Sequence, residues 1–156
     1  MSFQLTGLPH EPFEALFELS DAQLAEMGVV RVTANGNSGY PCRVSLVEAE
    51  AGETLLLLPY EHQPAVSPYK SSGPIYVRKG SRQRTLAAGE IPSCVSSRLI
   101  SIRAYDAAHF IIEAEVRDGS LVASEIERQF SNADVAYIHL HNAKRGCFSC
   151  LVNRAR

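Results

Sequence analysis

The side chains with the clearest potential for chemistry lie between residues 137 and 150. Residues two apart on a strand point to the same side, so His139 and His141 are predicted to share one face. Two imidazoles at this spacing can converge on one metal ion, and a Cys-x-x-Cys motif follows at Cys147 and Cys150. Two histidines and two cysteines form a complete tetrahedral ligand set, so this stretch predicts a zinc site.

The same residues leave other interpretations open. An alternating strand needs a polar face, and histidines can simply occupy it. The cysteines could remain free thiols or react, because a single Cys-x-x-Cys motif without a second pair is a weak metal signal. If zinc binds, four protein ligands would make the site structural, whereas three would leave a position for water and allow hydrolysis. Whether the protein is an enzyme stays open.

A second group of candidates follows the strand predicted at residues 54–60. Glu61 and His62 could act as an acid and a base near neutral pH, although an exposed loop is the alternative for this segment. The competing function is a metal-free pocket for a small anionic molecule. Its charge would come from an arginine and its mouth from polar side chains: Arg43, Arg78 or Arg103 for the charge, and Tyr60, His62 and Lys70 for the mouth.

Composition places the chain among ordinary globular proteins. It has 156 residues, of which 46% are hydrophobic and 21% charged, which predicts a single domain over residues 1–156. Fifteen Lys and Arg against seventeen Asp and Glu give a net charge of −2, so neither nucleic acid nor a membrane is an expected partner. The basic run at residues 78–84 is expected to be a solvated loop. A third hypothesis is an interaction module without a pocket, with its oligomeric state open.

The sequence also bears on location. Residues 1–20 contain no Lys or Arg, and the longest strongly apolar run is Leu55–Leu58. A signal peptide and a membrane span both need longer apolar runs, so we expect a cytoplasmic protein. Its four cysteines are then expected to stay reduced unless they bind metal or react.

Helix signals come first along the chain, and strand signals follow. Ser20 and Gln23 have the spacing of a capping box, and Gly28 is a helix stop. Pro12 suits the first turn of an earlier helix. The expected elements after Gly28 are a strand at Val29–Thr33, a hairpin turn at Asn35-Gly36, a return strand at Tyr40–Leu46, a strand buried on both faces at Thr54–Tyr60, a proline-punctuated loop, and a short strand at Ile75–Arg78.

In the second half of the sequence, apolar and polar residues alternate more regularly. Leu99–Tyr105 and Phe110–Val116 are predicted to form an antiparallel pair with one solvated face, the second strand placing its apolar residues opposite Glu113 and Glu115. Ser120–Phe130 is predicted to be an amphipathic helix, and Val135–His141 a last strand before a loop and tail. Few helices and many strands predict an α+β fold with a mainly antiparallel sheet.

Five segments carry a family resemblance: Gly39–Arg43, Tyr60–Pro64, Ser67–Tyr69 with Ser72–Pro74, Arg103–Asp106, and His139–Ala143 with Gly146–Cys150. Together they resemble the bacterial family known as domain of unknown function 1203, over nearly the whole chain. The resemblance implies a bacterial, single-domain protein. It implies no particular activity.

Overall fold

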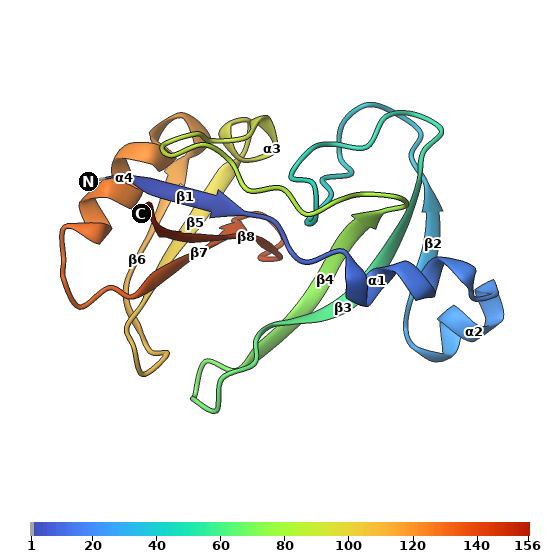
Figure 1. The fold of residues 1–156 in the computed structure, drawn as a ribbon, viewed down its shortest axis with the longest axis horizontal. Coiled ribbons are helices and arrows are strands. Elements are labelled where there is room, and N and C mark those ends of the chain that lie inside the picture. Colours follow the sequence, from blue (N-terminus) through green and yellow to red (C-terminus); the bar gives the residue numbers. More distant parts are fainter. Residues whose placement is uncertain (1) are drawn as a thin grey trace.

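Two antiparallel β-sheets lie side by side in the computed structural model, which describes residues 2–156 (Figure 1). The first sheet has five strands in the order β1-β8-β7-β5-β6, and the second has three in the order β2-β3-β4. The strands of the first sheet are β1 (Phe3–Thr6), β8 (Phe148–Arg154), β7 (Tyr137–Asn142), β5 (Leu99–Tyr105) and β6 (Ile111–Asp118). Those of the second are β2 (Val30–Thr33), β3 (Thr54–Gln63) and β4 (Ser71–Arg78).

Short helices accompany each sheet. The second sheet is flanked by α1 (Glu11–Glu14), a 3-10 turn (Ala15–Glu18) and α2 (Asp21–Glu26), whereas α3 (Ser93–Ser96), a 3-10 turn (Gly119–Leu121) and α4 (Val122–Phe130) belong to the first. The predicted α+β class with antiparallel sheets is therefore confirmed. No helix among residues 2–156 is long and apolar enough to cross a membrane.

The main hydrophobic core lies between the first sheet and α4. Ile100, Ile102 and Ala104 of β5 are fully buried there, as their alternation predicts, and they pack with Ile126 and Phe130 of the helix. A second cluster fills the space between the second sheet and α1, and it includes Phe148 of β8. Phe148 therefore ties the two sheets together.

The capping signals of the first half are confirmed. The Ser20 side chain accepts a hydrogen bond from the Gln23 backbone N–H, and the Gln23 side chain accepts one from the Ser20 backbone N–H. Gly28 follows the helix with a φ of 73°, a conformation that glycine adopts without steric cost.

The hairpin predicted at Asn35-Gly36 is wrong. β2 pairs instead with β3, and residues 34–53 form a long excursion between them. Tyr40–Leu46 is not a strand but a tight loop, held by single bridges between Pro41 and Glu48 and between Cys42 and the β4 residue Tyr76. Loop closure over many residues costs little more free energy than a two-residue turn, so the turn signal alone could not decide the pairing.

The proline-punctuated loop is shorter than predicted. Pro59 and Pro74 lie opposite each other inside β3 and β4, and only the segment between Gln63 and Ser71 is a turn. Prolines are tolerated there because their missing N–H groups remove ladder bonds only locally, next to the register shift between Tyr60 and Gln63.

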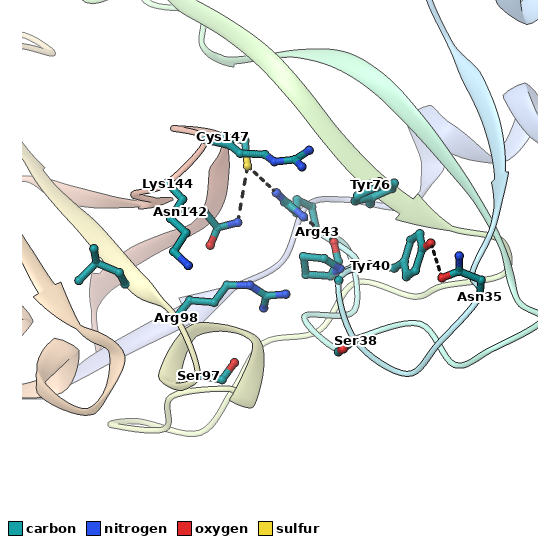
Figure 2. Close-up of a pocket in the computed structure, with 14 residues that line it drawn as sticks. Asn35, Ser38, Tyr40, Arg43, Tyr76, Ser97, Arg98, Asn142, Lys144 and Cys147 are labelled. Atoms are coloured by element: carbon teal, nitrogen blue, oxygen red, sulfur yellow. Dashed lines mark hydrogen bonds between the residues drawn. The ribbon is translucent and has the colours of Figure 1, made fainter.

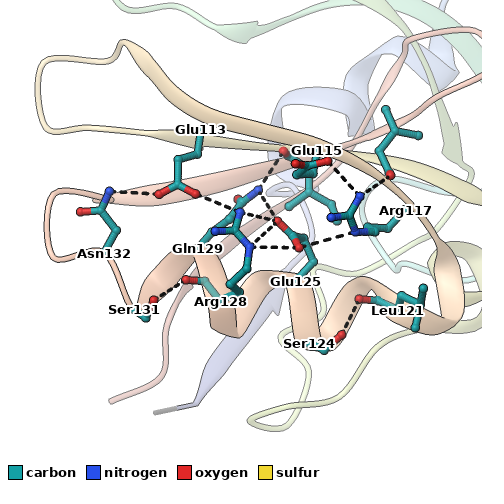
Figure 3. Close-up of polar contacts among 12 residues, drawn as sticks. Glu113, Glu115, Arg117, Leu121, Ser124, Glu125, Arg128, Gln129, Ser131 and Asn132 are labelled. Atoms are coloured by element: carbon teal, nitrogen blue, oxygen red, sulfur yellow. Dashed lines mark hydrogen bonds and ion pairs between the residues drawn. The ribbon is translucent and has the colours of Figure 1, made fainter.

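β6 presents the opposite face from the one predicted. Ile112 and Val116 are exposed, whereas Glu113 faces α4, where its carboxylate accepts hydrogen bonds from Arg128 and Asn132 (Figure 3). The buried Glu125 also pairs with Arg128, at 2.7 Å, and this guanidinium is the largest cause of the lowered pKa of Glu125. Carboxylate–guanidinium pairing therefore fixes β6 against the helix, where apolar contact was expected.

Two strands carry weaker sequence signals. The C-terminal segment, expected as a loop and tail, forms β8 between β1 and β7, and β1 was not predicted. The pairing of β7 with β8 places Leu140 opposite Cys150 and His141 opposite Phe148, so that Ser149 is skipped and β8 bulges. This bulge decides which side chains of the Cys-x-x-Cys region face the histidines.

Candidate functional site

A cavity of about 540 Å3 lies between the loop at residues 35–43 and the ends of β5 and β7. Arg43, Arg98, Lys144 and Arg145 line it, and no Asp or Glu is among its lining residues. Figure 2 shows Arg43, Arg98 and Lys144 approaching the opening from three separate segments. Its remaining lining combines polar groups with a thiol: Asn35, Ser38, Gly39, Tyr40, Pro41, Tyr76, Ser97, Leu99, Asn142 and Cys147.

Arg43 is the innermost cation of this cavity. It is only 3% exposed, yet no carboxylate within residues 2–156 forms an ion pair with it. Its Nε donates to the Phe148 carbonyl at 2.8 Å, Nη1 donates to the Pro41 carbonyl at 2.6 Å, and Nη2 donates to the Cys147 Sγ at 3.3 Å. Burial lowers the pKa of the guanidinium, and nearby Cys147 acts in the opposite direction. A guanidinium stays charged in proteins even so, which leaves a buried positive charge without a carboxylate.

The backbone holds the Arg43 loop firmly. The Arg43 N–H donates to the Tyr76 carbonyl, and its own carbonyl accepts from the Leu8 N–H. Gly7 passes so close that a Cβ there would lie 2.0 Å from the Val44 carbonyl oxygen. Only glycine permits this approach, so the segment after β1 clamps the loop that carries the cation.

The other three cations of the cavity differ in whether a carboxylate pairs with them. Arg98 forms an ion pair with Glu48 and donates to the Cys94 carbonyl. Lys144 and Arg145 lie in the exposed turn between β7 and β8, and neither forms an ion pair within the described part of the chain. The cavity therefore carries three positive charges that no carboxylate compensates.

Cys147 lies on the wall of the cavity, partly exposed. Besides the contact with Arg43, its Sγ accepts a hydrogen bond from Asn142 Nδ2 at 3.6 Å. The Asn142 Oδ1 atom is buried and has no hydrogen-bond partner in residues 2–156. Two N–H donors therefore meet at one sulfur, beside a buried amide oxygen that could accept a further bond (Figure 2).

A second polar cluster packs against the Phe148 ring, where β3 faces β7. Ring centroids of His62 and His141 are 4.8 Å apart, and His139 lies 6.1 Å from His62 and 6.2 Å from His141. The Phe148 ring stacks on His62 with an interplanar angle of 3°. The sequence predicted the shared face of the two β7 histidines, and β3 adds the third imidazole.

Burial keeps these imidazoles neutral. It is the largest cause that lowers the pKa of His139 and of His141 to about 3, and the charge of Arg103 contributes in the same direction. The pKa of His62 is also lowered, mainly by burial. His141 Nδ1 lies 2.9 Å from the Gly146 carbonyl, which can only accept, so this nitrogen carries the hydrogen.

The four residues of the predicted zinc site do not come together. His139 and His141 face the second sheet, Cys147 lies in the cation-lined cavity, and Cys150 is buried in the main core. The pairing of β8 with β7 causes this separation. Cys150 lies opposite Leu140 and therefore faces away from the histidines, and the skipped Ser149 places Phe148, not Cys147, opposite His141. Burial raises the pKa of Cys150 far above its usual range. Within residues 2–156, no group of three or more His, Cys, Asp or Glu is arranged to hold a metal ion.

The other sequence-predicted residues are also dispersed. Glu61 is exposed on β3, whereas His62, its neighbour, joins the histidine cluster, so the two do not form a dyad. Arg43 is the one member of the predicted anion pocket that lines the cavity. The rest lie elsewhere: Tyr60 packs against Phe13 and Phe148, Lys70 is exposed near the β3–β4 turn, Arg78 pairs with Glu53, and Arg103 donates to Ser101 beside the histidines.

Nothing in the sequence indicated that Arg98 belongs to the site. It follows the short helix α3, and only the fold brings it opposite the loop at residues 35–43. Lys144 and Arg145 also line the cavity, although neither was among the site residues predicted from the sequence. Their position beside Cys147 in the sequence was the available signal, because one turn carries all three.

Comparison with known proteins gives one match. Residues 39–154 match the model of a family described as a protein of unknown function (DUF1203). Searches of curated proteins and of solved structures found no match. The matched segment includes every cation that lines the cavity.

Proposed function

Since the chain belongs to the DUF1203 family of proteins of unknown function, we propose a function from the cavity itself, namely the binding of a small anionic molecule between the two sheets. The observation that carries this proposal is the Arg43 guanidinium, 3% exposed and without a carboxylate partner in residues 2–156. A buried charge is costly unless an opposite charge compensates it. An anionic ligand in the cavity would supply that charge.

The chemistry of the lining fits a carboxylate or a phosphate. A guanidinium has five N–H donors, and Arg43 uses three of them on Phe148, Pro41 and Cys147, which leaves two for a ligand. Planar guanidinium groups bind carboxylates and phosphates through paired hydrogen bonds. Lys144 and Arg145 at the rim would attract the anion from solution.

The proposal is tested by thermal shift and by isothermal titration calorimetry at low salt. The probes are inorganic phosphate, sulfate, citrate and adenosine monophosphate, with spermidine as a cationic control. We expect at least one anion to raise the melting temperature and to bind with an affinity that falls as sodium chloride is added. A flat response to all four anions would contradict the proposal.

Variants locate the binding site. The double variant Lys144→Gln/Arg145→Gln should weaken binding about tenfold, because each exposed cation contributes roughly 0.5–1 kcal/mol. Arg43→Lys keeps the charge but loses the paired geometry, and it should weaken binding further. Lys70→Gln is the matched control, because Lys70 is an exposed cation outside the cavity. Equal losses in Lys70→Gln and in the double variant would refute a site in this cavity.

A further inference from the structure

Cys147 differs from the other three cysteines in its surroundings. Among residues 2–156 it is the one cysteine that lines the cavity, while Cys42, Cys94 and Cys150 are buried. Burial raises the pKa of Cys94 to about 11, so that thiol is inert near neutral pH. The sulfur of Cys147 is accessible from a space whose charge is positive.

The contacts of Cys147 place this sulfur within the proposed anion site. Its Sγ is 3.3 Å from Arg43 Nη2 and 3.6 Å from Asn142 Nδ2, so both donors hold it in position at the wall. An anion that pairs with Arg43 would therefore lie against the sulfur. Lys144 and Arg145, three and two residues before Cys147, add positive charge at the same opening.

We propose that Cys147 forms a mixed disulfide with small disulfides that carry carboxylates and enter this cavity. The inference rests on the proposed anion binding and names the class of ligand for the same site. Two observations support it independently of the thiol: the cavity of about 540 Å3 is lined by four cations, and Arg43 is buried without a carboxylate partner in the described residues. Positive potential in a cleft raises the local concentration of anions.

The reaction is a thiol–disulfide exchange. The Cys147 thiolate attacks one sulfur of the bound disulfide, and a new S–S bond forms as the original one breaks. The electron pair leaves on the second sulfur, and that thiolate takes up the proton that Cys147 released. The disulfide itself is the oxidant, since its leaving half is reduced to a thiol while Cys147 is oxidised to the mixed disulfide.

The test compares two disulfides of opposite charge. Wild-type protein is incubated with glutathione disulfide, which is anionic, or with cystamine, which is cationic, and adduct formation is followed by intact mass and peptide mapping. Each rate is divided by the rate of the same disulfide with 2-mercaptoethanol, a neutral thiol. We expect the normalised rate to favour glutathione disulfide about tenfold. Lys144→Gln/Arg145→Gln should reduce that preference, whereas Lys70→Gln should preserve it.

Two results would overturn the inference. One is a normalised rate for cystamine that equals or exceeds that of glutathione disulfide. The other is an adduct that persists in Cys147→Ser, which would place the reaction on a different cysteine. Phosphate titration of the wild-type protein separates this inference from the proposed function. Phosphate binding without a preference for the anionic disulfide contradicts the thiol reaction alone, whereas the absence of both contradicts both.

Discussion

Two kinds of buried nitrogen base contact Phe148, and they differ in whether burial removes their charge. The histidine cluster, made of His62, His139 and His141, packs against the Phe148 ring and is neutral. Arg43 donates to the Phe148 backbone carbonyl and keeps its charge. An imidazole can release its proton when it is desolvated, whereas a guanidinium cannot.

This difference assigns different roles to the two regions. Burial lowers the pKa values of the cluster histidines, so these rings carry no charge that a ligand would have to balance. The cavity holds a fixed charge without a carboxylate partner in residues 2–156, and this charge is the reason for the proposed anion binding. Arg128 illustrates the usual solution: it lies against Glu125 and Glu113, and these hydrogen bonds raise its pKa (Figure 3). Within residues 2–156, Arg43 has no such partner.

The largest expected effect comes from the residue that the two regions share. Phe148→Ala should lower the free energy of unfolding by about 3–5 kcal/mol, because a buried aromatic ring leaves a cavity. The backbone carbonyl that accepts from Arg43 remains in the variant. Urea denaturation followed by circular dichroism measures the loss.

Phe148→Leu is the matched control, since it keeps most of the apolar volume and should cost less. Phosphate affinity should change little in either variant, provided the measurement is made where both are folded. A loss of less than about 1 kcal/mol in Phe148→Ala would show that the ring does not join the two sheets.

The second effect is a loss of stability in acid. The pKa values of His139 and His141 are about 3 in the folded protein and about 6.5 when unfolded, so the unfolded chain binds more protons between these values. The free energy of unfolding should therefore fall as pH falls below about 6.5. Between pH 6.5 and pH 5 the loss should be about 2–4 kcal/mol for the two groups together.

Urea denaturation at pH 7 and pH 5 measures this slope. His139→Gln should flatten it, because one titrating group is removed, whereas the exposed His109→Gln should leave it unchanged. A slope that is identical in wild type and His139→Gln would contradict a neutral, desolvated imidazole at this position.

The sequence predicted local features better than the site. The capping box at Ser20 and the shared face of His139 and His141 depend on neighbouring residues, and both are present. The zinc hypothesis required Cys147 and Cys150 to face the histidines. The register of β8 places Cys150 opposite Leu140, and a bulge of one skipped residue places Phe148 opposite His141. Bulges of this kind are set by pairing with another strand, which no local pattern encodes.

The cavity is hard to predict for a related reason. Arg43 and Arg98 are far apart in the sequence, and they meet only because residues 34–53 form an excursion where a hairpin was expected. β6 shows the same effect, because Glu113 faces α4, where it pairs with Arg128 and Asn132. In each case, contacts between segments far apart in the sequence determine the arrangement.

The smallest expected effect tests whether the cations of the cavity repel one another. Arg145→Glu replaces one uncompensated charge with its opposite, so it should raise the free energy of unfolding by a few tenths of a kcal/mol at low salt. The gain should vanish at about 0.5 M sodium chloride, where charges are screened over a few ångströms.

The same variant, Arg145→Glu, should bind phosphate more weakly, because the attraction at the rim is reversed. Lys70→Glu, which changes the same charge outside the cavity, should alter neither quantity. Destabilisation by Arg145→Glu would mean that another group already balances these cations, and the need of Arg43 for an anionic ligand would then disappear.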